Sequence, residues 1–138
     1  MCPKCHEPLI VVEFEGVEID YCPECRGTWF DAGELEFVTE LGGVPAGPLH
    51  RALQMAGAGR GGTRRCPRCR RKMHVIALGD SPPVEVDRCR AGHGLWLDAG
   101  ELVTIVREFA GNEDAVVAGF LADLLRHGLA EHTGRGEL

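Results

Sequence analysis

Eight residues of this 138-residue chain have the side-chain types and the spacing of metal ligands. They form two groups of four, namely Cys2, Cys5, Cys22 and Cys25 early in the chain and Cys66, Cys69, Cys89 and His93 later. Thiolates and imidazoles are the donors that Zn²⁺ prefers, and a tetrahedral site needs four of them. Two close pairs separated by a spacer are a typical arrangement of such a site. The sequence therefore predicts two bound zinc ions.

The number of cysteines favours metal over disulfides. Seven cysteines leave one thiol over in a disulfide scheme, whereas seven cysteines and one histidine complete two tetrahedral sites. Thiols stay reduced inside the cell. The chain does not start with a charged segment followed by an apolar run, and it lacks a stretch of roughly 20 apolar residues. We therefore expect a cytoplasmic protein with no membrane association.

The eighth ligand is the least regular position of the pattern. Counting back from the tryptophan that follows each second pair, the residue equivalent to Cys25 is Gly92. His93 comes one residue later, and its longer side chain can reach the metal. His74 is the competing candidate, although it lies on a predicted strand away from the second pair. We favour His93, with His74 as the alternative.

Each group of ligands brackets a predicted β-hairpin. In the first copy, β-rich runs over 9–14 and 17–21 are separated by a turn containing glycine, and the second copy has runs over 75–78 and 84–88. The two ends of a hairpin are adjacent in space. One ligand pair at its entrance and one at its exit therefore converge on one ion.

The segment Asp-Ala-Gly-Glu-Leu follows the ligands in both copies and predicts a helix start. Asp31 and Asp98 suit the N-cap position, and Glu34 and Glu101, three residues on, suit the partner position of a capping box. Paired acids also suggest catalysis. Capping is the simpler interpretation, because the spacing matches a helix start.

The string Trp29–Leu35 and its copy Trp96–Leu102, together with the cysteine pairs and the hairpins, resemble a known family. The chain is similar to the transcription-factor-IIB-type zinc-ribbon family of small, mostly bacterial proteins, over residues 2–38 and 66–106. The resemblance implies zinc ribbons with a short trailing helix, with all seven cysteines as ligands, and a link to nucleic acid or transcription. Each tryptophan is expected to cover its metal site and hairpin. The predicted fold is a small metal-stabilised α+β protein with two tandem zinc ribbons and a C-terminal helix.

The chain divides into five predicted segments. They are a first ribbon with a short helix (1–41), a Gly- and Pro-rich linker (42–65), a second ribbon with its helix (66–111), an amphipathic C-terminal helix (112–130) and a frayed tail (131–138). A linker of this composition is flexible enough to let the ribbons move separately, although a short helical turn is possible over Leu49–Met55. The apolar stripe of the C-terminal helix packs on its own domain or mediates self-association or partner binding.

Charge is unevenly distributed along the chain. The formal net charge is −6, and residues 1–41 hold ten acids against two bases. Seven cations fall within residues 60–72, namely Arg60, Arg64, Arg65, Arg68, Arg70, Arg71 and Lys72. Such a segment suits nucleic-acid phosphates. Alternatively, these side chains balance the zinc thiolates and pair with the acidic first ribbon.

These observations support three functional hypotheses. The favoured one is a non-catalytic interaction module with structural zinc and a protein partner, because no nucleophile–base constellation accompanies the ligands. The alternative is a nucleic-acid-binding or transcription-associated protein that uses residues 60–72. The third is a redox or zinc sensor built on the mixed cysteine–histidine site.

Overall fold

The computed structural model describes residues 1–79 and 82–109, so the predicted C-terminal helix (112–130) and tail (131–138) lie outside the described residues. Seven strands and three helices occur in the described part of the chain. In chain order they are β1 (Ile10–Phe14), β2 (Val17–Tyr21), β3 (Thr28–Asp31), α1 (Glu34–Leu41), α2 (Ala46–Met55), β4 (Arg60–Arg65), β5 (Lys72–Leu78), β6 (Val84–Arg88), β7 (Gly94–Leu97) and α3 (Glu101–Phe109). This composition confirms the α+β class.

Both predicted hairpins are present, and they share one register. In β1–β2, Ile10 pairs with Tyr21, and in β5–β6 the equivalent His74 pairs with Arg88. The first turn consists of Glu15 and Gly16, whose φ angles of 52° and 84° are both positive, as a two-residue turn of type I′ requires. The second hairpin is longer than predicted, because β5 begins at Lys72.

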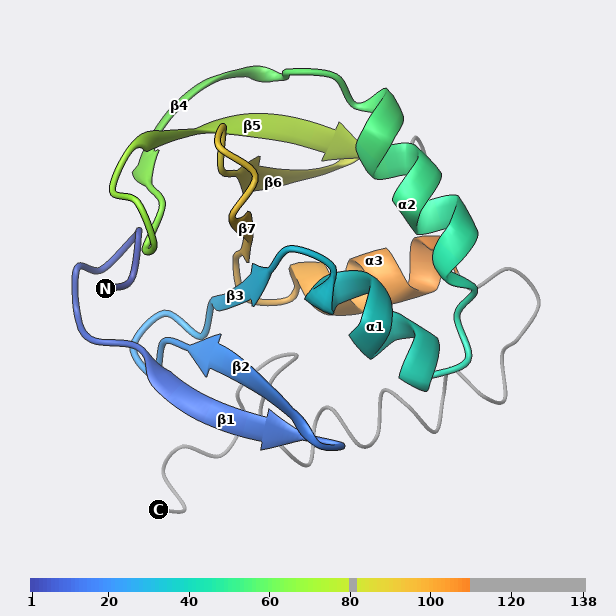
Figure 1. Cartoon of the computed structure of the whole chain (residues 1–138), viewed down its shortest axis with the longest axis horizontal. Helices are drawn as coiled ribbons and strands as arrows, with labels where there is room; N and C mark the ends of the chain where they lie inside the picture. The colour runs from blue at the N-terminus through green and yellow to red at the C-terminus, as the bar shows by residue number, and fades with distance from the viewer. Residues whose placement is uncertain (80–81, 110–138) are drawn as a thin grey trace.

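The two ribbons are joined by a strand pair that the sequence analysis did not predict. Strands β3 and β7, which carry the two tryptophans, pair antiparallel with Trp29 opposite Trp96. The result is one seven-stranded sheet in the order β1-β2-β3-β7-β6-β5-β4, in which equivalent strands flank the central pair (Figure 1). The repeated unit of the sequence therefore pairs with its own copy.

The segment 42–65 differs from the expected flexible linker. It contains α2, which is longer than the expected helical turn, and β4, which pairs with β5 at one edge of the sheet. Leu49 of α2 is fully buried, and the Arg88 guanidinium donates a 2.8 Å hydrogen bond to the Leu53 carbonyl. At Gly59 a Cβ atom would lie 2.2 Å from the Val75 carbonyl oxygen, so this glycine permits close packing. The segment between the ribbons is therefore folded against the sheet.

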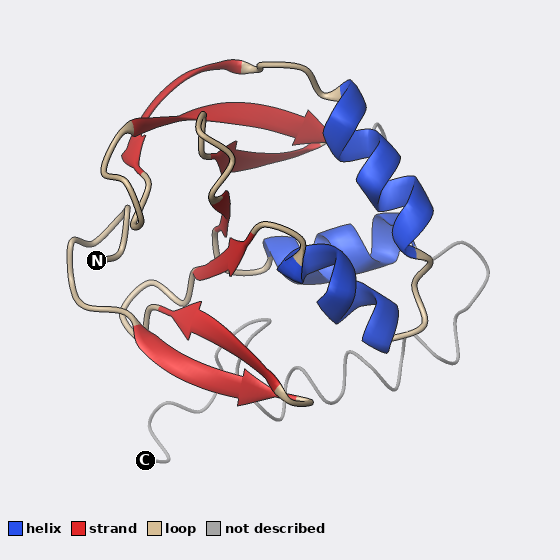
Figure 2. Cartoon of the chain, in the orientation of Figure 1, coloured by secondary structure: helices blue, strands red, loops and turns tan. Residues whose placement is uncertain are grey.

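Buried side chains form two clusters. The larger one lies between the sheet and the three helices, which gather on one side of the sheet in Figure 2. It includes Phe30 from β3 and Leu35, Leu49 and Ile105 from the three helices. The smaller cluster consists of Met73, the two tryptophans and the cysteines. The sheet thus separates an ordinary apolar core from the predicted metal sites.

Candidate metal centres

The first ligand group is gathered at the base of the β1–β2 hairpin. The sulfur atoms of Cys2, Cys5, Cys22 and Cys25 all lie within 4.8 Å of one another. The sulfurs of Cys2 and Cys25 are 3.7 Å apart, close to the roughly 3.8 Å that separates two sulfurs in a tetrahedron with zinc–sulfur bonds of about 2.3 Å. A disulfide would bring them to about 2.0 Å. This donor set fits a Zn²⁺ ion.

Backbone amides around the cysteines donate hydrogen bonds to the sulfur atoms that would bind the metal. The amides of Lys4 and Cys5 donate hydrogen bonds of 3.3 and 3.2 Å to the Cys2 sulfur. The amide of Arg68 makes the equivalent 3.3 Å contact with Cys66 in the second ribbon. Such bonds stabilise thiolates and orient them toward the metal, as supporting contacts do around metal ligands generally.

The second ligand group brings together Cys66, Cys69, Cys89 and His93, with all four donor atoms within 4.8 Å. The His93 Nδ1 atom lies 3.3 Å from the Cys89 sulfur. The competing His74 lies elsewhere, with its Nδ1 atom 2.8 Å from the Ala58 carbonyl oxygen. This group also fits a Zn²⁺ ion, and the structure gathers His93 rather than His74 with the cysteines.

The aspartates of the repeated string have a different role from the predicted one. Helix α1 is capped by Gly33, with φ of 87° and no side-chain cap hydrogen bond, so the prediction that Asp31 is the N-cap is wrong. The Asp31 carboxylate instead accepts a 2.8 Å hydrogen bond from the Trp29 indole, and Asp98 accepts a 3.1 Å bond from Trp96. At α1 the aspartate carboxylate therefore binds the indole and does not cap the helix.

The glutamates of the string bond to the amides of the aspartates three residues earlier. The Glu34 carboxylate accepts a 2.9 Å hydrogen bond from the Asp31 amide, and the Glu101 carboxylate accepts one of 2.7 Å from the Asp98 amide. Because Gly33 is the N-cap, Glu34 is the first residue of α1, so its bond closes the turn before the helix and is not part of a capping box. Burial raises the pKa of Glu101 to about 7. In both ribbons this contact fixes the turn between the third strand and its helix.

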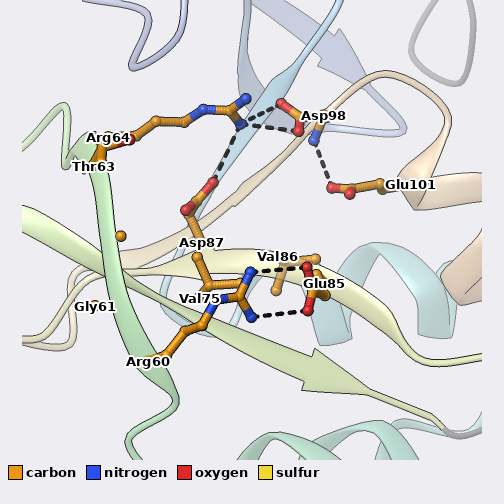
Figure 3. Close-up of a pocket in the computed structure, with 11 residues that line it drawn as sticks. Arg60, Gly61, Thr63, Arg64, Val75, Glu85, Val86, Asp87, Asp98 and Glu101 are labelled. Carbon is orange, nitrogen blue, oxygen red and sulfur yellow. Dashed lines mark hydrogen bonds and ion pairs between the residues drawn. The ribbon is translucent and has the colours of Figure 1, made fainter.

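In each ribbon an equivalent pair of aspartates holds one arginine. Asp87 and Asp98 bind Arg64, whose Nη1 atom lies 3.4 and 2.7 Å from their oxygens (Figure 3). In the first ribbon, Asp20 and Asp31 bind Arg68, which comes from the second ribbon. The hydrogen bond from Arg68 lowers the pKa of Asp31. Arg68 is thus an electrostatic link between the two ribbons.

The basic segment 60–72 is divided by these contacts. Arg60 pairs with Glu85 at 2.9 Å, so three of its seven cations form ion pairs inside the protein. The other four, which make no ion pair with the described residues, are Arg65, Arg70, Arg71 and Lys72. The contacts of Arg68 with Asp20 and Asp31 agree with the expected alternative of pairing with the acidic first ribbon, whereas the partners of Arg60 and Arg64 in the second ribbon were not expected. The signal was present, because Glu-x-Asp precedes the third ligand by the same offset in both copies.

The sequence profile of the transcription factor zinc-finger family, a TFIIB-type zinc ribbon, matches residues 1–40 and 65–108. The chain belongs to this family and contains two tandem copies of its unit. No curated protein and no solved structure gives a significant match to the chain. Within residues 1–79 and 82–109, none of the helices has the length and hydropathy to cross a membrane.

Proposed function

We propose that this protein is a non-catalytic interaction module in which two zinc ions have a purely structural role. The observation that carries the proposal is that each of the two ligand groups offers four converging donors, and a structural site uses all four. Catalytic zinc sites instead keep a position open for water or substrate. The eight ligands are Cys2, Cys5, Cys22, Cys25, Cys66, Cys69, Cys89 and His93. Cysteines that bind zinc and form no disulfide in the structure are consistent with a cytoplasmic location.

Zinc removal tests the structural role. Zinc contributes roughly 10–16 kcal/mol to the folding of finger peptides, more than a small core supplies. We expect two zinc ions per chain by elemental analysis, and loss of β-sheet circular dichroism when a chelator removes them. Re-addition of zinc to the reduced chain should restore the signal. A chelated protein that retains its sheet would contradict the proposal.

Nucleic-acid binding is the second candidate, and one observation favours it. Arg65 and Arg70, which make no ion pair with described residues, line a cavity of about 200 Å³ together with His6, between the first cysteine turns of the two ribbons. Two arginines beside one cavity suit phosphate. The test is a titration of the zinc-loaded protein with single- and double-stranded nucleic acid at several salt concentrations.

Matched variants separate this candidate from the first. Replacement of Arg65, Arg70, Arg71 and Lys72 by alanine should abolish a salt-dependent interaction with nucleic acid. Replacement of the exposed Arg51 on α2 should leave it unchanged. Absence of binding at low salt would leave a protein partner as the proposed ligand. A zinc-sensor role is the third candidate, and it requires the mixed cysteine–histidine site to lose zinc to mild oxidants before the all-cysteine site.

A further inference from the structure

We propose that the outer edge of β1 is a docking site for an extended, arginine-containing segment of a partner protein, which adds to the sheet as an antiparallel strand. The inference rests on the proposed role as an interaction module and names the surface and the chemistry of the partner. Strand β1 is at one end of the sheet formed by the described residues. The edge of a terminal strand presents backbone donors and acceptors to an incoming strand.

The second ribbon supplies an internal template for this interaction. Strand β5 is the equivalent of β1, because Val75 pairs with Asp87 just as Val11 pairs with Asp20. The outer edge of β5 is covered by β4, in which Arg60 lies opposite Val75. The fold therefore already contains one example of a strand added at this edge, while the described residues provide none for β1.

The template defines the chemistry of the added strand. Strand β4 has the sequence Arg-Gly-Gly-Thr-Arg-Arg. A Cβ atom at Gly62 would lie 2.9 Å from the Met73 carbonyl oxygen, so glycine allows the close approach of the two backbones. The Arg60 guanidinium reaches across Val75 to Glu85 and makes two hydrogen bonds of 2.9 and 3.1 Å (Figure 3). Glycine and arginine are thus the features that β4 uses.

The first ribbon offers the same carboxylate and a second one beside it. Glu18 is the equivalent of Glu85, because each lies four residues before the third ligand of its ribbon. Glu13 occupies the position of Ala77 and lies directly opposite Glu18. Both glutamates are exposed, and neither has an ion pair with a described residue. Like charges facing each other across two strands are destabilising, so an arriving guanidinium would remove this repulsion.

The remaining contacts on this face direct the arginine to the two glutamates. The Asp20 carboxylate, next to Glu18 on the same face, is already paired with Arg68. Val11, opposite which the arginine would lie, is 61% exposed and offers apolar surface to its aliphatic stem. Exposed ion pairs contribute little to affinity, so most of the affinity comes from backbone hydrogen bonds. We expect a weak, reversible complex.

The test uses the full zinc-loaded chain and a synthetic peptide with the sequence of residues 58–65, Ala-Gly-Arg-Gly-Gly-Thr-Arg-Arg. We expect saturable binding, with chemical-shift changes and slower amide exchange in Ile10–Phe14. Glu18→Arg should weaken the binding of the peptide at least tenfold. Glu40→Arg is the matched control, because it makes the same charge change on exposed α1, and it should leave the affinity unchanged. Circular dichroism and zinc content verify that both variants fold.

A second peptide separates strand addition from charge attraction. It carries the same three arginines but has proline in place of Gly61 and Thr63, so that it cannot form the hydrogen-bond ladder. This peptide should bind at least tenfold more weakly. Equal binding of the two peptides, equal binding to Glu18→Arg and the wild type, or shifts confined to β5 through displacement of β4 would overturn the inference. If the protein holds two zinc ions and unfolds on chelation but does not bind the peptide, the docking site is refuted and the structural role of zinc is not.

Discussion

At the residue scale, equivalent aspartates of the two ribbons form ion pairs with arginines from different places in the chain. Asp98 receives Arg64, from the strand that precedes the second ribbon, and Asp31 receives Arg68, from the second ribbon's first cysteine turn. Each aspartate also accepts the indole N–H of its own ribbon. A carboxylate that accepts several charge-assisted bonds favours its ionised form, and the pKa of Asp31 is lowered accordingly.

Arg68→Ala tests this link. The change removes the partner of Asp20 and Asp31, and because Arg68 is 41% exposed, we expect a loss of only about 1 kcal/mol in the free energy of unfolding at pH 7. The pKa of Asp31 should rise in the variant. A carboxyl group whose pKa is lowered by folding stabilises the folded protein at pH values above the ordinary pKa of that group. The difference in free energy of unfolding between variant and wild type should therefore shrink as the pH falls below about 4.

Chemical denaturation and an NMR titration of the Asp31 carboxyl measure the two effects. Arg71→Ala is the control, because this neighbouring arginine has no ion pair with the described residues. An unchanged Asp31 pKa in Arg68→Ala would contradict the assignment.

Glu101→Gln tests the contact between the buried Glu101 carboxylate and the Asp98 amide. Burial raises the pKa of Glu101 from 4.5 to about 7, so the folded protein binds this proton more tightly than the unfolded chain does. The contribution of Glu101 to the stability of the wild-type protein therefore becomes less favourable as the pH rises from about 4.5 to 7. Glutamine retains the oxygen that accepts from the Asp98 amide and has no charge to bury. Relative to wild type, the variant should gain stability from about pH 4.5 to pH 7. The free energy of unfolding from urea denaturation measures this, and the same pH dependence in both proteins would disprove it.

At the element scale, the β3–β7 pair depends on two glycines at equivalent positions. A Cβ atom at Gly27 would lie 2.2 Å from the Trp96 ring, and one at Gly94 would lie 2.8 Å from the Trp29 ring. Each ribbon therefore leaves room for the tryptophan of the other. Both tryptophans are fully buried, and they pack with the cysteines as expected. The same rings that cover the metal sites also join the ribbons.

Gly27→Ala tests this packing. The added methyl group would overlap a ring that has no free space to move into, so we expect a loss of about 1–3 kcal/mol in the free energy of unfolding. Gly47→Ala is the matched control. Beyond the backbone of its own helix, a Cβ atom at Gly47 in α2 would have no neighbour within 4 Å, and alanine in a helix should stabilise by about 0.5–1 kcal/mol. Thermal denaturation of the zinc-loaded proteins measures both, and equal stability of Gly27→Ala and the wild type would refute close packing at this position.

At the scale of the whole molecule, the two ribbons form one body. The sheet is continuous from β1 to β4 through the β3–β7 pair, and Arg68 spans the ribbons on one face. Helix α2 lies between the ribbons in sequence and packs against α1. A zinc ribbon alone is too small for a substantial core, so the joined arrangement provides buried surface that neither copy has by itself.

Backbone relaxation by NMR tests whether the two ribbons reorient together. We expect the strands of both ribbons to report one rotational correlation time, because the central ladder and the buried tryptophans prevent independent reorientation. Two different correlation times for β1–β2 and β5–β6 would instead support the flexible linker inferred from composition. Repeating the measurement on Gly27→Ala shows whether the β3–β7 contact maintains the single body.

Local features of the structure could be predicted from the sequence. The two ligand groups, both hairpins and the glutamate contacts at the helix starts depend on residues that are close along the chain, where spacing alone restricts geometry. Even His93 could be favoured over His74 by its offset from the second pair. The two ribbon folds and their zinc chemistry followed from these short-range patterns.

The arrangement of the ribbons was decided only by tertiary structure. Arg64 and Arg68 find their aspartates 34 and 37 residues away in the sequence, and composition along the chain does not specify such partners. The composition of the Gly-rich segment 42–65 predicts a flexible linker, but glycine permits both disorder and close strand packing. Only the neighbouring backbone of β5 distinguishes the two, since the edge of that strand supplies the hydrogen bonds that order β4.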